Sequence, residues 1–317
     1  MSSSKRPHVI AIVGPTGVGK TTVGEQLALR MGGEVVSADS MQVYRGLDIG
    51  TAKLPASERR VPHHCIDLVD PGTPYSAALF QRDARAAIDS IAAAGHVPLM
   101  VGGTGLYIRA ALDEMNFPAG DSSSPVRENL QAFLDREGPE ALYALLQERD
   151  ADAAALIHRN NSRRVLRALE MLETDETSYV HAAEHFAERA PFYPATFIGL
   201  MAERDLLYRR IDARVDAMIA GGLLDEVRGL LDAGYRSSLT AAQAIGYKEL
   251  VPVIDGNGDL DSAVAAIKQA SRRYAKRQMT WFRADPRVRW LDVTDLSPAA
   301  AADAAFALVE SEAAPRS

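Results

Sequence analysis

One octapeptide has the residue types and the spacing of a phosphate-binding loop: Gly14-Pro15-Thr16-Gly17-Val18-Gly19-Lys20-Thr21. It fits the pattern G-x-x-x-x-G-K-[ST], whose glycines let backbone N–H groups turn toward phosphate oxygens. Lys20 adds a positive charge, and the hydroxyl of Thr21 is a ligand for Mg²⁺. The alternative is a chance glycine-rich turn. The pattern predicts a bound phosphate but leaves open which one, and whether it is transferred or departs.

A carboxylate follows another strand-like segment, at Asp39. Ligands of open α/β sheets bind at the carboxyl ends of the strands, so we expect Asp39 to face the ligand. It could act there as a general base or orient a nucleophile. The alternative is that Asp39 caps the segment that follows it.

The apolar run 97–101 ends in Gly102-Gly103-Thr104-Gly105, without an acidic residue. A P-loop ATPase usually has at this place the Asp that helps to hold Mg²⁺. Backbone amides and the hydroxyl of Thr104 are present instead. These groups suit an anion that is held by hydrogen-bond donors.

The elements that must position these residues alternate along the chain. An apolar run leads into the octapeptide and a helical pattern leads out of it. Further strand-like segments recur with helical patterns between them, and the five segments are 8–13, 34–37, 97–101, 196–201 and 288–291. This alternation predicts an α/β fold with a P-loop and a parallel sheet covered on both faces.

The strand-like segments stop over residues 112–191, where only helical patterns remain. We therefore predict a P-loop core made of residues 1–111 and 192–317, interrupted by an inserted all-helical subdomain, 112–191. Insertions over a binding face are commonly lids. The C-terminal part is predicted to be largely helical and includes a basic helix at 262–283.

Composition gives the setting of these elements. The chain has 317 residues, 47% of them hydrophobic, and a net charge of −7. The single cysteine, Cys65, excludes a disulfide framework, and the first apolar run is too short for a signal peptide or a membrane span. We expect a cytoplasmic protein without a membrane partner.

Basic residues are clustered in this acidic chain. One cluster comprises Lys268, Arg272, Arg273, Lys276, Arg277 and Arg283, and another comprises Arg159, Arg163, Arg164 and Arg167. Each run could be a solvated helix face. Two such runs favour a nucleic-acid partner, for which local charge matters more than net charge.

Longer segments resemble, in order and spacing, the tRNA dimethylallyltransferases, also called tRNA isopentenyltransferases. The segments that carry the resemblance include the octapeptide, Asp39-Ser40-Met41-Gln42-Val43-Tyr44, Gly102-Gly103-Thr104-Gly105, Ala244-Ile245-Gly246-Tyr247-Lys248 and Ala275-Lys276-Arg277-Gln278-Met279-Thr280-Trp281. The resemblance covers essentially the whole chain, and the Asp-Ser and Ala-Lys-Arg-Gln segments are far more specific than the P-loop.

The resemblance implies transfer of a dimethylallyl group from dimethylallyl diphosphate to N6 of the adenine immediately 3′ of the anticodon in tRNA, with release of pyrophosphate. It implies that residues 14–21 hold the diphosphate, with Mg²⁺ at Thr21. It also implies catalytic roles for Asp39, Thr104 and Arg214. Residues expected to contact tRNA are Asp39, Ser40, Met41, Gln42, Thr104, Arg127, Arg163, Arg164, Arg167, Gly246, Lys248, Arg272, Arg273, Lys276 and Arg277.

The expected partners are thus the anticodon stem-loop of tRNA and dimethylallyl diphosphate, with the enzyme acting as a monomer. Two other functions stay open at this point. In a P-loop small-molecule kinase, Asp39 would orient a substrate hydroxyl, but the basic clusters would have no role. In an RNA-binding module with a vestigial nucleotide site, RNA binding would not respond to diphosphates.

Overall fold

The computed structural model describes residues 6–117, 124–174, 178–234, 236 and 243–313. The chain divides into two compact units. The first comprises Met1–Asp113 and Pro191–Ser317, and the second is Glu114–Ala190. Each unit has its own apolar core, because the buried side chains of the second unit form a separate cluster.

The first unit contains a six-stranded sheet in which all neighbouring strands are parallel, in the order β3-β2-β4-β1-β5-β6. The strands are β1 (Val9–Val13), β2 (Gly33–Ala38), β3 (His63–His64), β4 (Val97–Gly102), β5 (Ala195–Met201) and β6 (Val288–Asp292). Five of them are close to the segments expected from the sequence. The two-residue strand β3 was not predicted, because it is too short to show a periodic pattern.

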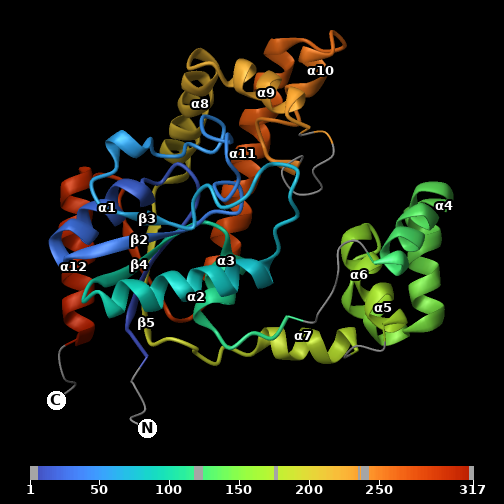
Figure 1. The fold of residues 1–317 in the computed structure, drawn as a ribbon, viewed down its shortest axis with the longest axis horizontal. Coiled ribbons are helices and arrows are strands. Elements are labelled where there is room, and N and C mark those ends of the chain that lie inside the picture. Colours follow the sequence, from blue (N-terminus) through green and yellow to red (C-terminus); the bar gives the residue numbers. More distant parts are fainter. Residues whose placement is uncertain (1–5, 118–123, 175–177, 235, 237–242, 314–317) are drawn as a thin grey trace. The chain divides into compact units, whose positions relative to one another are not determined.

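Helices cover both faces of this sheet (Figure 1). The helices of this unit are α1 (Lys20–Met31), α2 (Ala77–Ala93), α3 (Gly105–Leu112), α8 (Arg204–Ala220), α9 (Leu223–Asp232), α10 (Val251–Ile254), α11 (Leu260–Arg283) and α12 (Pro298–Ala313), with a short 3₁₀ turn η1 (Ala56–Glu58). Successive side chains of a strand point to opposite faces. Accordingly, Val9, Ala11 and Val13 belong to the core beneath α2 and α3, whereas Ile10 and Ile12 belong to the core beneath α1 and α12.

The regular elements of the second unit, within its described residues, are all helices. Its helices are α4 (Pro125–Arg149), α5 (Ala151–Leu156), α6 (Ser162–Glu173) and α7 (Tyr179–Ala187). Gly138 interrupts α4 with a φ of 85°, and Pro139 starts the next helical stretch. Leu142 and Leu146 of α4 pack with Val165 of α6 in the core of this unit.

The predicted fold class, an α/β P-loop core with an inserted helical subdomain and a largely helical C-terminal part, is confirmed. At the edge of the first unit, Asp113 and Pro191 form an antiparallel bridge, and Phe192 N donates to Leu112 O at 2.8 Å. Within the described residues, no helix combines the length and the apolar character needed to cross a membrane.

Candidate active site

The order of the strands places the P-loop, Asp39 and Thr104 next to one another. β4 lies between β1, which leads into the P-loop, and β2, which leads to Asp39. The loop after β4, with Gly103 and Thr104, therefore lies between the P-loop and Asp39. The carboxyl ends of these parallel strands form one edge of the sheet, which is where ligands of such sheets bind.

The P-loop has the geometry that its sequence predicts. Gly14 has a φ of 145°, and a Cβ atom there would lie 2.5 Å from the backbone oxygen of Leu200 on β5. Gly19, with a φ of 98°, stands at the N-cap of α1, and a Cβ atom there would meet only open space. Backbone N–H groups at the start of α1 are thus available to an anion, with the helix dipole in support.

Lys20 is the first residue of α1, and its Nζ donates to Pro15 O at 2.8 Å. Burial lowers the pKa of Lys20 to about 7, with the charge of Asp39 opposing this shift and the charge of Arg214 adding to it. A bound phosphate would restore the charge, because an anion favours the protonated amine. We therefore expect the charge of this lysine to depend on whether an anion is bound.

Arg214, on α8, contacts the P-loop directly. Its Nη2 donates to Thr16 Oγ1 at 2.5 Å, although the two residues are 198 positions apart. Its Nε is buried and, among the described residues, has no hydrogen-bond partner. Burial lowers the pKa of Arg214, and the charge of Asp39 opposes this. A buried guanidinium N–H without a partner is costly, so the arrangement favours a bound anion.

Asp39 and Thr104 occupy the loops after β2 and β4. Asp39 Oδ1 accepts from Met41 N at 2.9 Å, which closes a local turn. Thr104 Oγ1 accepts from Ser40 N at 3.0 Å, and Thr104 N donates to Ala38 O at 3.1 Å. Asp39 therefore closes the turn that follows it, as the alternative interpretation expected, and it also lines the cavity described next.

A cavity of about 420 Å³ opens at this edge of the first unit. Thr16, Asp39 and Arg214 line one part of it. Apolar side chains line another, among them Val215, Met218 and Ile267. The cavity therefore combines an anion-binding end, a carboxylate and an apolar wall. Further wall residues that the sequence predicted for the site are Ser40, Met41, Gly246, Lys248, Arg273 and Arg277.

The basic residues of α11 point to different sides of the helix. Arg273 and Arg277 line the cavity. Arg272 instead donates to both carboxylate oxygens of Asp212 on α8, and Lys276 lies in a separate groove with Met279. The structure therefore brings two of the four predicted α11 residues to the cavity and does not bring Arg272 or Lys276 there.

Gly246 and Lys248 belong to the segment before α10. Gly246 has a φ of 98°, and its N–H donates to Glu249 Oε2 at 2.8 Å. Lys248 Nζ lies 3.9 Å from Glu249 Oε1 and is 45% exposed. Both residues line the cavity. The positive charge of Lys248 therefore lies in the part of the cavity that solvent reaches.

The predicted arginines of the insertion lie within the second unit. Glu170, which is 2% exposed, accepts from Arg127 Nη1 and Arg167 Nη1, each at 3.0 Å. Arg163 and Arg164 lie at the start of α6 and are exposed. The first pair of arginines is thus held by a buried carboxylate, whereas the second pair faces solvent.

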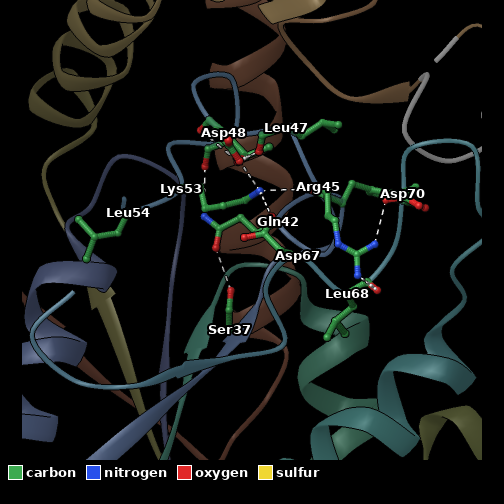
Figure 2. Close-up of polar contacts among 12 residues, drawn as sticks. Ser37, Gln42, Arg45, Leu47, Asp48, Lys53, Leu54, Asp67, Leu68 and Asp70 are labelled. Atoms are coloured by element: carbon green, nitrogen blue, oxygen red, sulfur yellow. Dashed lines mark hydrogen bonds and ion pairs between the residues drawn. The ribbon is translucent and has the colours of Figure 1, made fainter. Parts of the chain in front are cut away.

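The loop between Asp39 and Lys53 is shaped by contacts that the sequence did not indicate (Figure 2). Lys53 Nζ is buried and donates to Tyr44 O, to Asp48 Oδ1 and to Asp67 Oδ1, at 3.0, 2.5 and 2.6 Å. The ammonium group thus joins two parts of this loop, at Tyr44 and Asp48, to Asp67, which follows the loop in the chain.

Gln42, which the sequence predicted to contact tRNA, takes part in the same loop. Its Oε1 accepts from Ser37 Oγ at 2.9 Å, and its Nε2 donates to Thr51 O at 3.2 Å (Figure 2 draws the first of these contacts). The side chain therefore joins the end of β2 to the far side of the loop. In this structure its amide supports the cavity wall.

Two residues of α11 were missed by the sequence reasoning, Tyr274 and Gln278. Burial together with the charge of Asp39 raises the pKa of Tyr274 to about 12, while Thr104, Arg277 and Gln278 oppose this shift. The spacing of four residues between Tyr274 and Gln278, which places both on one helix face, was the signal that could have found them.

Comparison with known proteins agrees with this geometry. The sequence model of the family described as IPP transferase matches residues 42–285. The chain belongs to the IPP transferase family. A second family model, isopentenyl transferase, matches residues 7–60 and so includes the P-loop. The resemblance seen in the sequence is confirmed.

Relatives of this family member match along most of their length. The chain is 49% identical to the tRNA dimethylallyltransferase of Geobacillus thermodenitrificans, over 90% of this chain and 91% of the relative. It is 44% identical to the solved tRNA isopentenylpyrophosphate transferase of Bacillus halodurans, with a TM-score of 0.70, covering 97% of this chain and 98% of that one.

A eukaryotic dimethylallyltransferase whose structure was solved acting on tRNA is 30% identical, with a TM-score of 0.80. The similarity covers 98% of this IPP transferase family member and 80% of the eukaryotic chain. The two chains therefore share their fold over nearly the whole of this chain.

Proposed function

We propose that this enzyme transfers the dimethylallyl group of dimethylallyl diphosphate to N6 of the adenine immediately 3′ of the anticodon in tRNA, and releases pyrophosphate. One observation carries the proposal. Thr16 and Arg214, which can hold an anion, and Asp39, which can accept a proton, line a single cavity in a member of the IPP transferase family.

The P-loop end of the cavity binds the diphosphate in this proposal. The backbone N–H groups at the start of α1, Lys20 and the unpartnered Nε of Arg214 supply donors and positive charge. These groups stabilise the charge that develops on the leaving pyrophosphate as the bond between C1 and oxygen breaks. Donors that are already in place at such a position are among the strongest sources of catalysis.

We propose Mg²⁺ as the metal that accompanies the diphosphate. Thr21 lies in the first turn of α1 and is exposed, so its hydroxyl is available as a ligand. Among the described residues no group of three His, Cys, Asp or Glu side chains could hold a metal ion. This fits Mg²⁺, which commonly uses few protein ligands together with substrate phosphates and water. The ion would supply charge neutralisation of the departing pyrophosphate.

Asp39 acts on the nucleophile. As the N6 nitrogen of adenine forms its bond to C1 of the allyl group, one N6 proton passes to the carboxylate of Asp39. Its Oδ1 is fixed by Met41 N, so the carboxylate has a defined orientation. Thr104 supports the same turn through Ser40, which follows Asp39 in the chain.

The tRNA is bound by basic residues around the cavity and on the helical insertion. Arg273, Arg277 and Lys248 line the cavity, and Arg163 and Arg164 are exposed on α6. A stacked adenine cannot reach Asp39, so the base must leave its stack and enter the cavity. We assign the insertion, 112–191, the role of a lid that contacts the anticodon loop.

We propose that the enzyme acts as a monomer. We propose a cytoplasmic location, because the proposed substrate is tRNA. The two other functions are not favoured, because the family match spans residues 42–285 and so includes both basic clusters. A kinase leaves the cavity-lining Arg273 and Arg277 and the exposed Arg163 and Arg164 without a role, and an RNA-binding module leaves Lys20 and Arg214 without one.

The test is incubation with undermodified tRNA and dimethylallyl diphosphate, followed by mass analysis of the nucleosides. The expected product is a singly prenylated adenosine from the position 3′ of the anticodon, and pyrophosphate in equal amount. ATP in place of the diphosphate is the control. Phosphate transfer from ATP without prenylation would establish the kinase instead.

A further inference from the structure

The side chain of Gln278, on the buried face of α11, joins two loops of the site. It is 5% exposed. Its Oε1 accepts from Thr16 N in the P-loop at 2.8 Å, and its Nε2 donates to Gly103 O, after β4, at 3.0 Å. One contact needs the oxygen and the other needs the NH₂ group, so the amide has a single orientation.

The space around this amide is tightly filled. A Cβ atom added at Gly103 would lie 2.1 Å from Gln278 Nε2. One helical turn further along, a Cβ atom at Gly105 would lie 2.0 Å from Trp281 Nε1. The buried face of α11 therefore rests directly on the loop after β4, and glycines permit this approach.

Both loops lead from Gln278 to reacting groups. In the P-loop, Thr16 is held twice, since its N–H donates to Gln278 and its Oγ1 accepts from Arg214. The hydroxyl proton of Thr16 is then available to an oxygen of the diphosphate. On the other side, Gly103 precedes Thr104, which accepts the N–H of Ser40 beside Asp39.

We infer that Gln278 is a positioning residue, which sets the separation between the diphosphate end of the site and Asp39. The inference rests on the proposed function. Transfer requires the leaving oxygen, C1 and N6 to be aligned, and a misplacement of about 1 Å can cost about 10²-fold in rate. Removing the two hydrogen bonds of Gln278 should therefore slow the chemical step far more than it weakens substrate binding.

The test is Gln278→Met, which nearly conserves volume and removes both hydrogen bonds. The matched control is Gln269→Met, the same change at an exposed position of the same helix. We expect Gln278→Met to lower the single-turnover prenylation rate by about 10- to 100-fold. The dissociation constants of pyrophosphate and tRNA should change by less than about threefold, and Gln269→Met should behave as the wild type.

A double-mutant cycle with Thr16→Ala separates positioning from general destabilisation. Thr16→Ala keeps the backbone N–H that donates to Gln278 and removes only the hydroxyl, so if Gln278 acts by positioning that hydroxyl, the combined reduction in rate must be smaller than the product of the two single reductions. If Gln278→Met does not fold, Gly103→Ala gives the same test, because it displaces Nε2 and leaves the glutamine in place.

Two results would overturn the inference: a Gln278→Met rate within about twofold of the wild type, or reductions that multiply fully in the cycle. Both results presuppose that the wild-type enzyme prenylates tRNA in the same assay. Absence of prenylation by the wild type would instead contradict the proposed function itself, so the two failures are distinct.

Discussion

Arg272 Nη1 donates to both carboxylate oxygens of Asp212, at 2.5 and 2.7 Å, which fastens α11 to α8. Lys268, which lies one turn before Arg272 on α11, makes a similar contact with Asp216 of α8 at 2.6 Å. Part of the basic run on α11 therefore serves contacts between helices. Arg273 and Arg277 instead line the cavity, where their charge is available to a ligand.

This division predicts unequal effects on tRNA binding. Replacing Arg273 and Arg277 by glutamine should weaken binding and make the slope of log K against log salt shallower by about 0.7–0.9 for each phosphate that is no longer neutralised. Arg272→Gln should change the slope less, because its charge is already paired. Fluorescence anisotropy with an anticodon stem-loop at several salt concentrations measures the slopes. Equal changes for Arg272 and Arg273 would contradict the division.

Lys20→Ala should lower the prenylation rate by about 10²-fold or more, because a charge that stabilises the leaving pyrophosphate is removed. The affinity for tRNA should stay nearly unchanged, since Lys20 lies in the P-loop. Single-turnover rates and tRNA binding are measured on the same preparation. Near-normal turnover would refute the role assigned to the P-loop.

The pKa of Lys20, about 7, predicts a pH dependence of diphosphate binding. The protonated amine binds the anion better, and the anion raises the pKa in the complex. The contribution of Lys20 to the affinity should therefore be constant below pH 7 and fall as pH rises above it, with uptake of a proton by the amine on binding. Calorimetry of pyrophosphate binding in two buffers with different ionisation enthalpies measures this uptake. Lys20→Ala is the control, because the proton uptake that remains in this variant comes from the ligand itself. Equal proton uptake by the variant and the wild type would exclude Lys20 as the source of the proton uptake.

Asp39→Asn should reduce turnover by about 10²–10⁴-fold, the usual scale for removal of a general base. Asparagine keeps an oxygen that can accept from Met41 N, so the turn and tRNA affinity should be preserved. Rapid-quench prenylation assays and equilibrium binding give the two quantities. Prenylation at the wild-type rate would reduce Asp39 to a residue that closes a turn.

Glu170→Gln should destabilise the helical insertion by about 1–3 kcal/mol, less than a fully buried pair would lose because both arginines are partly exposed. Faster hydrogen exchange of the α6 amides is the measurement. The control is Glu140→Gln, since Glu140 is 85% exposed in its contact with Arg159. That surface pair should contribute about 0–1 kcal/mol. Equal exchange in both variants would show that Glu170 does not stabilise the unit.

The parts of the site that could be predicted are those that depend on local sequence. The P-loop follows from its own glycines and lysine. Asp39 and Thr104 follow from strand ends, because parallel strands bring their carboxyl ends to one edge. The apolar runs of β1, β4 and β5 are continuous, as expected for strands covered on both faces, and they indicated the fold class.

The remaining contacts join residues far apart in the chain, and spacing does not reveal them. Arg214 and Thr16 are 198 positions apart, and Gln278 and Thr16 are 262 apart. Arg272 and Asp212 are 60 positions apart. The run of basic residues on α11 therefore did not indicate that the charge of Arg272 is paired. Such pairs depend on the packing of α8 and α11, which only the folded chain defines.

The antiparallel bridge between Asp113 and Pro191 lets the core accommodate inserted chain of different lengths between these residues. The chain leaves the core after Asp113 and re-enters it at Pro191, and these two residues are neighbours in the bridge. The strands before and after the insertion therefore keep their register whatever length of chain lies between these residues. Insertions at such places are tolerated best. The helical segment can therefore be lengthened, trimmed or exchanged while the backbone arrangement at the sheet edge stays the same.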